Sequence, residues 1–103
     1  MLEIRLAILF ILLAVLFGCD SPSIAFQGAP MRVVTIGPST FSVRMRDDRV
    51  ESMRTSREWR PSESAIMERA AQAIEQATGC VLRKGSLTGD QAIQRARVVC
   101  DNG

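Results

Sequence analysis

The chain has 103 residues, with 13 Lys and Arg against 11 Asp and Glu, and it contains no histidine. This length allows one small domain, and a formal charge of +2 is too weak to indicate a nucleic-acid partner. The lack of histidine removes the commonest general base and the commonest metal ligand. We therefore expect no catalytic residues, no metal and no cofactor.

An apolar run, Leu6 to Phe17, lies near the start of the chain, with Arg5 as the only basic side chain before it. Its 12 residues are too few for a helix that crosses a bilayer, which takes roughly 20. They have the length of the apolar region of a signal peptide. The sequence therefore predicts that residues 1–18 are a signal peptide.

The tetrapeptide 16–19 (LFGC), which closes this run, resembles the lipobox of bacterial lipoproteins. Leu16 and Gly18 match the lipobox pattern, whereas Phe17 stands where a smaller residue is commoner. The resemblance implies that the Cys19 thiol receives a diacylglycerol, that the lipoprotein signal peptidase cuts before Cys19, and that the new amino group is usually acylated, which makes palmitate an expected modification. It also implies a lipid anchor in the cell membrane and a domain on the periplasmic side, and Asp20 favours the inner over the outer membrane.

The sequence also allows two other interpretations of Cys19. In one, Cys19 is a passive apolar residue of an uncleaved anchor. In the other, ordinary signal peptidase cuts after the small-x-small site 23–25 and releases a soluble protein that starts at Phe26. The lipid-anchored form is the one we expect, because two or three acyl chains hold a protein stably on a membrane, whereas one holds it only marginally.

Residues 19–30 are rich in Ser, Pro, Gly and Ala, which predicts a flexible tether between the lipid and the domain. The domain, residues 31–103, is predicted to be α+β, with the order β-β-β-α-β-β and one helix packed on one face of a small antiparallel sheet. Because Val50 and Met53 are three residues apart, we expect a bulge or an early exit in the third strand. The predicted strands are 31–36, 40–46, 49–55, 80–84 and 91–100.

The predicted helix covers residues 62–78, with Ser62 as its N-cap and Gly79 as its C-cap. A polar connection, residues 56–61, precedes it and carries Trp59, which we expect to lie over the edge of the core. The alternative is that Trp59 is an exposed aromatic that contacts a partner. The helix has an apolar stripe that should cover the inner face of the sheet. On that inner face we expect Phe41, Val43, Met45, Leu82, Ala96 and Val98.

Assigning Cys19 to lipid leaves Cys80 and Cys100, for which an oxidising periplasm predicts a disulfide. A hairpin in which the numbers of paired residues sum to 180 brings these two cysteines face to face. The same register pairs Leu82 with Val98 and Lys84 with Ala96 on one mostly apolar face. The disulfide and the apolar pattern therefore predict the same register.

The opposite sheet face is basic, and we identify it as a possible contact face for anionic lipid headgroups or an acidic protein. A merely solvated face is the alternative interpretation. The predicted contact face consists of Arg44, Arg46, Arg95 and Arg97.

These features predict a membrane-anchored envelope lipoprotein whose small, non-catalytic domain binds or supports another envelope component. The alternative is a periplasmic ligand-binding or enzymatic accessory domain that uses the 85–91 loop. In that alternative, the functional groups would be Ser86, Thr88 and Asp90, together with the acidic turn Asp47–Asp48.

Overall fold

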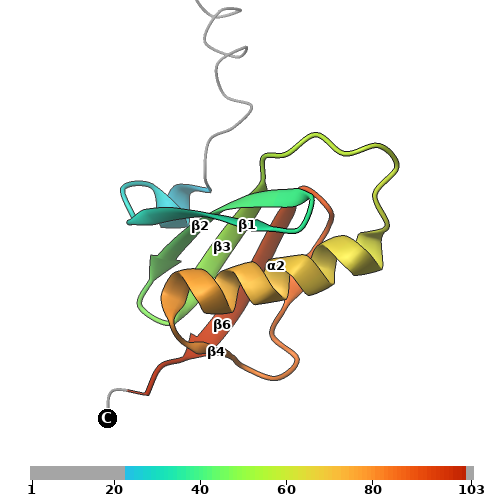
Figure 1. Ribbon diagram of the computed structural model, residues 1–103. Helices are drawn as coiled ribbons and strands as arrows, with labels where there is room; N and C mark the ends of the chain where they lie inside the picture. The colour runs from blue at the N-terminus through green and yellow to red at the C-terminus, as the bar shows by residue number, and fades with distance from the viewer. Residues whose placement is uncertain (1–22, 102–103) are drawn as a thin grey trace, which may run out of the picture.

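The computed structural model describes residues 23–101, and among them one α-helix packs on one face of a curled antiparallel sheet (Figure 1). The strand order is β1-β2-β3-β6-β4, and β5 also pairs with β6. This confirms the predicted α+β fold, with one short strand added. The predicted signal peptide, residues 1–18, and the predicted lipid site at Cys19 lie outside the described residues.

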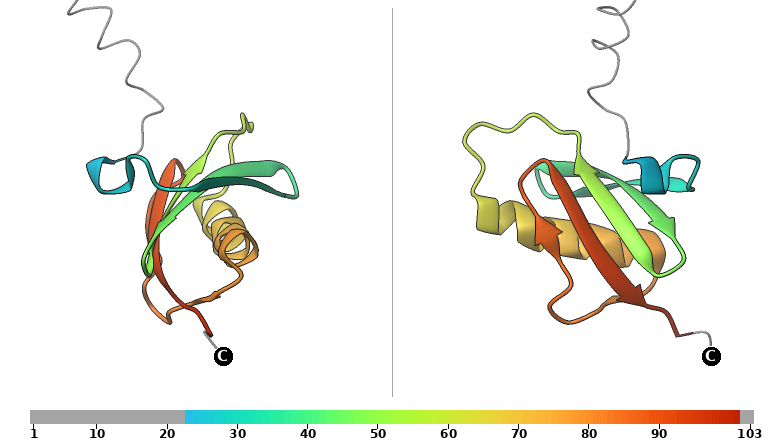
Figure 2. Two further views of the ribbon diagram at one scale, coloured as in Figure 1. Left: turned by 90° about the vertical axis from the view of Figure 1, so that its left-hand side faces the viewer. Right: turned by 180° about the vertical axis from the view of Figure 1, so that it is seen from behind.

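The strands are β1 (Met31–Ile36), β2 (Ser39–Arg46), β3 (Arg49–Arg54), β4 (Val81–Leu82), β5 (Thr88–Gly89) and β6 (Ile93–Val99). The helix α2 spans Glu63–Thr78, and a single turn of 3-10 helix, η1, spans Ile24–Phe26. The helix and η1 lie on opposite sides of the sheet, as the side view in Figure 2 shows. We call the sheet face against α2 the inner face and the other the outer face.

The helix begins and ends where the sequence predicts. The Ser62 hydroxyl accepts a hydrogen bond from the Ala65 amide at 3.3 Å, which satisfies one of the free N–H groups of the first turn. Gly79 ends the helix in the left-handed conformation with φ 69°. The predicted apolar stripe is buried against the inner face: Ile66, Ala70, Ala73, Ile74 and Ala77.

The predicted inner-face residues contribute to this core. Phe41, Val43, Ala96 and Val98 are buried in it, and Met45 and Leu82 are partly buried against it. The small alanines of the helix stripe let α2 lie close to the strands. The disulfide half Cys80 belongs to the same cluster, so the bridge closes one end of the core.

Strand β3 has no bulge, so the prediction of a bulge or an early exit is wrong. Its Cα pairing with β2 runs without interruption from Phe41–Arg54 to Arg46–Arg49. Val50 is buried in the core under α2, whereas Met53 is buried on the outer face. Both residues are buried because β3 lies in the middle of the sheet, where both the inner and the outer face are protected. A regular strand can therefore bury side chains on its two opposite faces.

The last hairpin keeps the predicted register only at the end beside the Cys80–Cys100 bridge. Val81 pairs with Val99 and Leu82 with Val98, as predicted. Beyond Arg83 the chain turns outward, and β5 pairs with β6 in a register shifted by three residues. The predicted pair of Lys84 with Ala96 is therefore wrong.

The physical reason is that the outward turn keeps a lysine off the apolar face. Lys84 is exposed, and Leu87 packs partly buried against the core. The Ser86 hydroxyl replaces the missing ladder partner, because it donates to the Arg97 carbonyl and accepts from the Arg97 amide, both at 3.1 Å. The side chain thus takes over the hydrogen bonds that a continued strand would make.

Cys80 and Cys100 form the predicted disulfide, with their Cα atoms 4.5 Å apart. Cys80 follows the helix cap, and Cys100 follows β6. The bridge therefore ties the end of α2 to the end of the last strand.

Replacing Cys80 and Cys100 together by alanine should lower the free energy of unfolding by about 3 kcal/mol, because the bridge closes a loop of about 20 residues in the unfolded chain. Denaturant titration followed by circular dichroism measures the loss. The control is Val99→Ala, an exposed position beside the bridge. A double variant as stable as this control would contradict a stabilising role for the bridge.

Candidate functional site

The outer face brings the four predicted arginines together. In the Cα register, Arg44 and Arg95 lie on either side of Glu51. Arg46 and Arg97 lie on either side of a further arginine, Arg49. The sequence-based prediction included neither Glu51 nor Arg49, because it expected an irregular third strand and could not assign those residues to a face.

Glu51 is a carboxylate at the centre of this face with a side chain only 1% exposed. It accepts hydrogen bonds from the Ser23 amide at 3.1 Å and from the Ser23 hydroxyl at 2.7 Å. Arg95 approaches the same carboxylate at 3.4 Å. A buried charge is costly unless it is paired and hydrogen-bonded, so these partners explain how Glu51 is tolerated there.

The segment that starts at Ser23 is docked on the outer face. The Arg46 guanidinium donates to the carbonyls of Ala25, at 3.2 Å, and Gln27, at 2.9 Å. Phe26, in η1, is only 5% exposed. Residues 23–30, which the sequence assigned to a flexible tether, therefore contact the domain, because an aromatic ring and a buried carboxylate hold them on the sheet.

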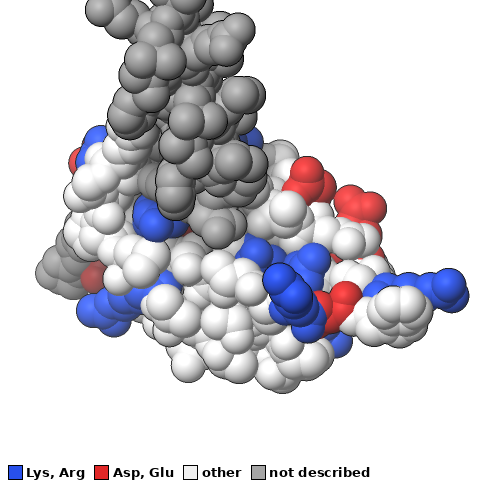
Figure 3. All heavy atoms as spheres, turned by 90° about the horizontal axis from the view of Figure 1, so that it is seen from above, with Lys and Arg blue, Asp and Glu red and all other residues white. Residues whose placement is uncertain are grey.

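The arginines of the predicted contact face thus make contacts within the domain. Arg97 lies 3.5 Å from Asp48, and Arg44 donates to the Met53 sulfur at 3.8 Å. Figure 3, which views the molecule from above, shows basic side chains on several sides of the point where the chain enters the described domain. The outer face is basic, and part of that charge organises η1 and the turn after β2.

The connection between β3 and α2 presents Trp59 to solvent. Trp59 is 87% exposed, so the prediction that it covers the edge of the core is wrong. The connection turns Glu58 inward instead, and Arg60 adopts φ 46°, a left-handed conformation that is uncommon for arginine. The Arg60 guanidinium lies 5.5 Å from the centre of the Trp59 ring, within the range of a cation–π contact.

Glu58 fixes this connection through a dense polar cluster. Its carboxylate accepts hydrogen bonds from the hydroxyls of Ser39 and Ser56, at 2.9 and 2.8 Å. It also pairs with Arg54 at 3.1 Å and Arg69 at 3.3 Å. Burial alone would raise the pKa of Glu58, but the hydrogen bonds from Ser56, Ser39 and Arg54 outweigh it and hold the pKa below its usual value.

The 85–91 loop uses its polar groups to stabilise its own structure. Asp90 accepts hydrogen bonds from the amides of Ile93 and Ala92, and these bonds lower the pKa of the Asp90 carboxyl. The Ser86 hydroxyl bonds to the Arg97 backbone, and Thr88 donates to the Arg95 carbonyl at 3.5 Å. The groups named for the alternative ligand-binding function therefore act here as a turn cap and as bonds to β6.

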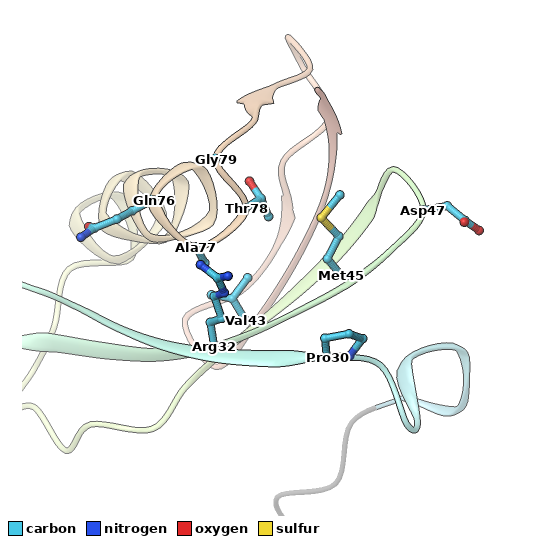
Figure 4. A pocket seen from close by; sticks show the side chains of 9 residues that line it. All are labelled: Pro30, Arg32, Val43, Met45, Asp47, Gln76, Ala77, Thr78 and Gly79. Carbon is cyan, nitrogen blue, oxygen red and sulfur yellow. The ribbon is translucent and has the colours of Figure 1, made fainter. Parts of the chain in front are cut away.

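A groove of about 480 Å³ lies between the end of α2 and the β1–β2 hairpin (Figure 4). Of the residues drawn there, Arg32 points toward α2, whereas Gln76 and Asp47 point away from the centre. The walls are otherwise largely apolar or small, with Val43 and Met45 on the sheet side. The groove has no convergent set of polar groups of the kind that orients a substrate.

Two further observations concern the described residues, 23–101. Within this range, no helix is long and apolar enough to cross a membrane. Nor do three or more of its acidic, cysteine or histidine side chains gather into a group that could hold a metal ion. The features that stand out are the docked η1 segment, the basic outer face and the exposed Trp59.

Replacing Glu58 by glutamine should destabilise the domain by about 2 kcal/mol at pH 7, because Arg54 and Arg69 lose a buried charged acceptor. The pKa of Glu58 is lower in the folded than in the unfolded chain. Its contribution is therefore present above the unfolded pKa and is lost as the pH falls through the folded pKa.

Urea titrations from about pH 6 to pH 3 should therefore show a smaller loss of stability for Glu58→Gln than for the unaltered chain. Glu68→Gln, which alters an exposed carboxyl of α2, is the matched control. Equal pH dependence in the two variants would show that the cluster does not stabilise the fold in this way.

Comparison of the chain with protein-family models, with curated proteins and with solved structures found no match. The function must therefore be argued from the residues themselves.

Proposed function

We propose that this protein is a lipid-anchored lipoprotein of the bacterial cell envelope, with a small non-catalytic domain that binds or supports another envelope component. The observation that carries the proposal is the pairing of Cys80 with Cys100. Because the chain has three cysteines, this pairing leaves Cys19, which directly follows the apolar run and its Leu16–Gly18 lipobox residues. The anchor would be acylated Cys19, on the periplasmic side of the inner membrane.

The disulfide also supports the compartment. Structural disulfides persist in oxidising environments such as the bacterial periplasm and are rare in the cytosol. The lipobox near the start of the chain and the disulfide in the domain both indicate an exported protein. The proposal therefore joins two independent features, one from the leader and one from the fold.

A binding role fits the domain better than catalysis does. The polar side chains of the 85–91 loop are engaged in local hydrogen bonds, as described above. The exposed tryptophan is a more suitable functional group, because Trp is enriched among the residues that contribute most to binding at interfaces. The Glu58 cluster holds the residue next to Trp59, so this ring is presented on an ordered connection. We therefore propose Trp59 as the main contact with the envelope partner.

Replacing Cys19 by alanine in the full chain should prevent acylation and cleavage before residue 19. Mass spectrometry of the intact protein from the producing bacterium should show diacylglycerol on the unaltered chain and none on Cys19→Ala. The Cys80→Ala/Cys100→Ala chain is the control and should stay acylated. A mature protein that starts at Phe26, or an unmodified Cys19, would refute the lipoprotein assignment.

A photo-crosslinking amino acid at position 59 should yield a discrete adduct in living cells, whereas the same amino acid at exposed Arg57 should yield little. The two positions share one connection, so the comparison separates contact by the ring from mere proximity. Adducts of equal yield at both positions, or at neither, would argue against Trp59 as the partner contact.

A further inference from the structure

We infer that the domain rests on the membrane through the outer surface of η1, β1 and β2, with anionic phospholipid headgroups as the group it contacts. We call this the membrane-facing surface, and its residues are Ile24, Met31, Val33, Arg44 and Arg46. The inference rests on the proposed acylation of Cys19, and it adds the orientation of the domain and the chemistry of the surface that it contacts.

The first argument is the length of chain between the anchor and the domain. Ser23 is fixed to Glu51 by two hydrogen bonds, so the docked part of the chain begins there. From Cys19 to Ser23 the chain advances four residues, which span at most about 14 Å when fully extended. An anchor in the bilayer therefore holds the surface around Ser23 within about 14 Å of the lipid. A connection this short limits how far the domain can rotate relative to the membrane.

The second argument is the apolar character of this surface. Ile24 is 86% exposed, Val33 59% and Met31 49%. Met31 and Val33 alternate along β1, opposite Arg44 and Ser42 on the outer face. Large exposed apolar side chains within 14 residues of the anchor can enter the boundary between headgroups and acyl chains, as the apolar faces of interfacial proteins do.

The third argument is the charge beside these apolar residues. Arg44 pairs in register with Met31, and Arg46 follows on the same side of β2. The nearby acid Glu51 is buried and paired with Arg95, so it does not present its charge at the surface. Basic side chains such as Arg44 and Arg46 are attracted to the negative surface potential of anionic lipids.

The structure also provides a control surface. Val81, on β4, is 65% exposed and belongs to the other edge of the same sheet. It matches Val33 in residue type, in exposure and in its place on an edge strand. Figure 1 shows β1 on the side where the chain enters and β4 on the opposite side, near the C-terminus.

The experiment uses single-tryptophan versions of the full chain, purified from bacterial membranes. Trp59→Phe is combined either with Val33→Trp or with Val81→Trp, and each protein is reconstituted into phosphatidylcholine vesicles with or without phosphatidylglycerol. Lipids brominated near the headgroup quench a tryptophan that lies at the interface. With phosphatidylglycerol, the tryptophan at 33 should be quenched roughly threefold more than that at 81, and high salt should reduce the difference.

Equal quenching at the two positions, or stronger quenching at 81, would overturn the inference. Met31→Trp in the same background is a second probe of the membrane-facing surface. It replaces Val33→Trp if that variant misfolds, which a missing Cys80–Cys100 disulfide would reveal. The intact mass reports acylation of Cys19 separately. An acylated chain without selective quenching refutes the orientation alone, whereas an unacylated Cys19 refutes the anchor and, with it, the orientation.

Discussion

The sheet has two faces, and the described chain has one α-helix to cover them. The sheet curls around α2, and the alanines of the helix let it lie close to the inner face, which is buried in a compact core. The outer face has to be protected by other means. Phe26 and the η1 segment cover part of it, and the buried Glu51 fastens that cover by accepting hydrogen bonds from Ser23 and pairing with Arg95. The docked segment is therefore part of the fold, and the position of the proposed anchor follows from it.

Two carboxylates, one buried and one partly buried, organise the ends of this arrangement. Glu51 holds the entering chain, and Glu58 holds the connection before α2, each by accepting several hydrogen bonds and pairing with arginine. A small domain has few apolar residues to spare, so bonds of this kind fix segments that a larger core would fix by packing. The surfaces that we propose for function, around Ile24 and at Trp59, each adjoin one of these carboxylates.

The sequence predicted the elements whose signals are local. Helix α2 is defined by its cap residues, Ser62 and Gly79, and by the alanine stripe. The bridged end of the last hairpin is defined by the cysteine pair and its apolar neighbours. It failed where the outcome depends on contacts distant in sequence. Docking of Phe26 depends on Glu51, and exposure of Trp59 depends on Arg54 and Arg69 drawing Glu58 inward. Two signals were available in the sequence: Phe26, a lone aromatic in a Ser- and Pro-rich segment, and Glu51, an acid inside a predicted strand.

The place of β6 in the sheet has a consequence for synthesis. The last strand of the chain lies between β3 and the edge strands β4 and β5, and Cys100 comes directly after it. During synthesis, β3, β4 and β5 therefore lack the neighbour that they share until β6 has been made. The sheet cannot close before then, and the bridge between Cys80 and Cys100 cannot form until Cys100, which follows β6, has been added.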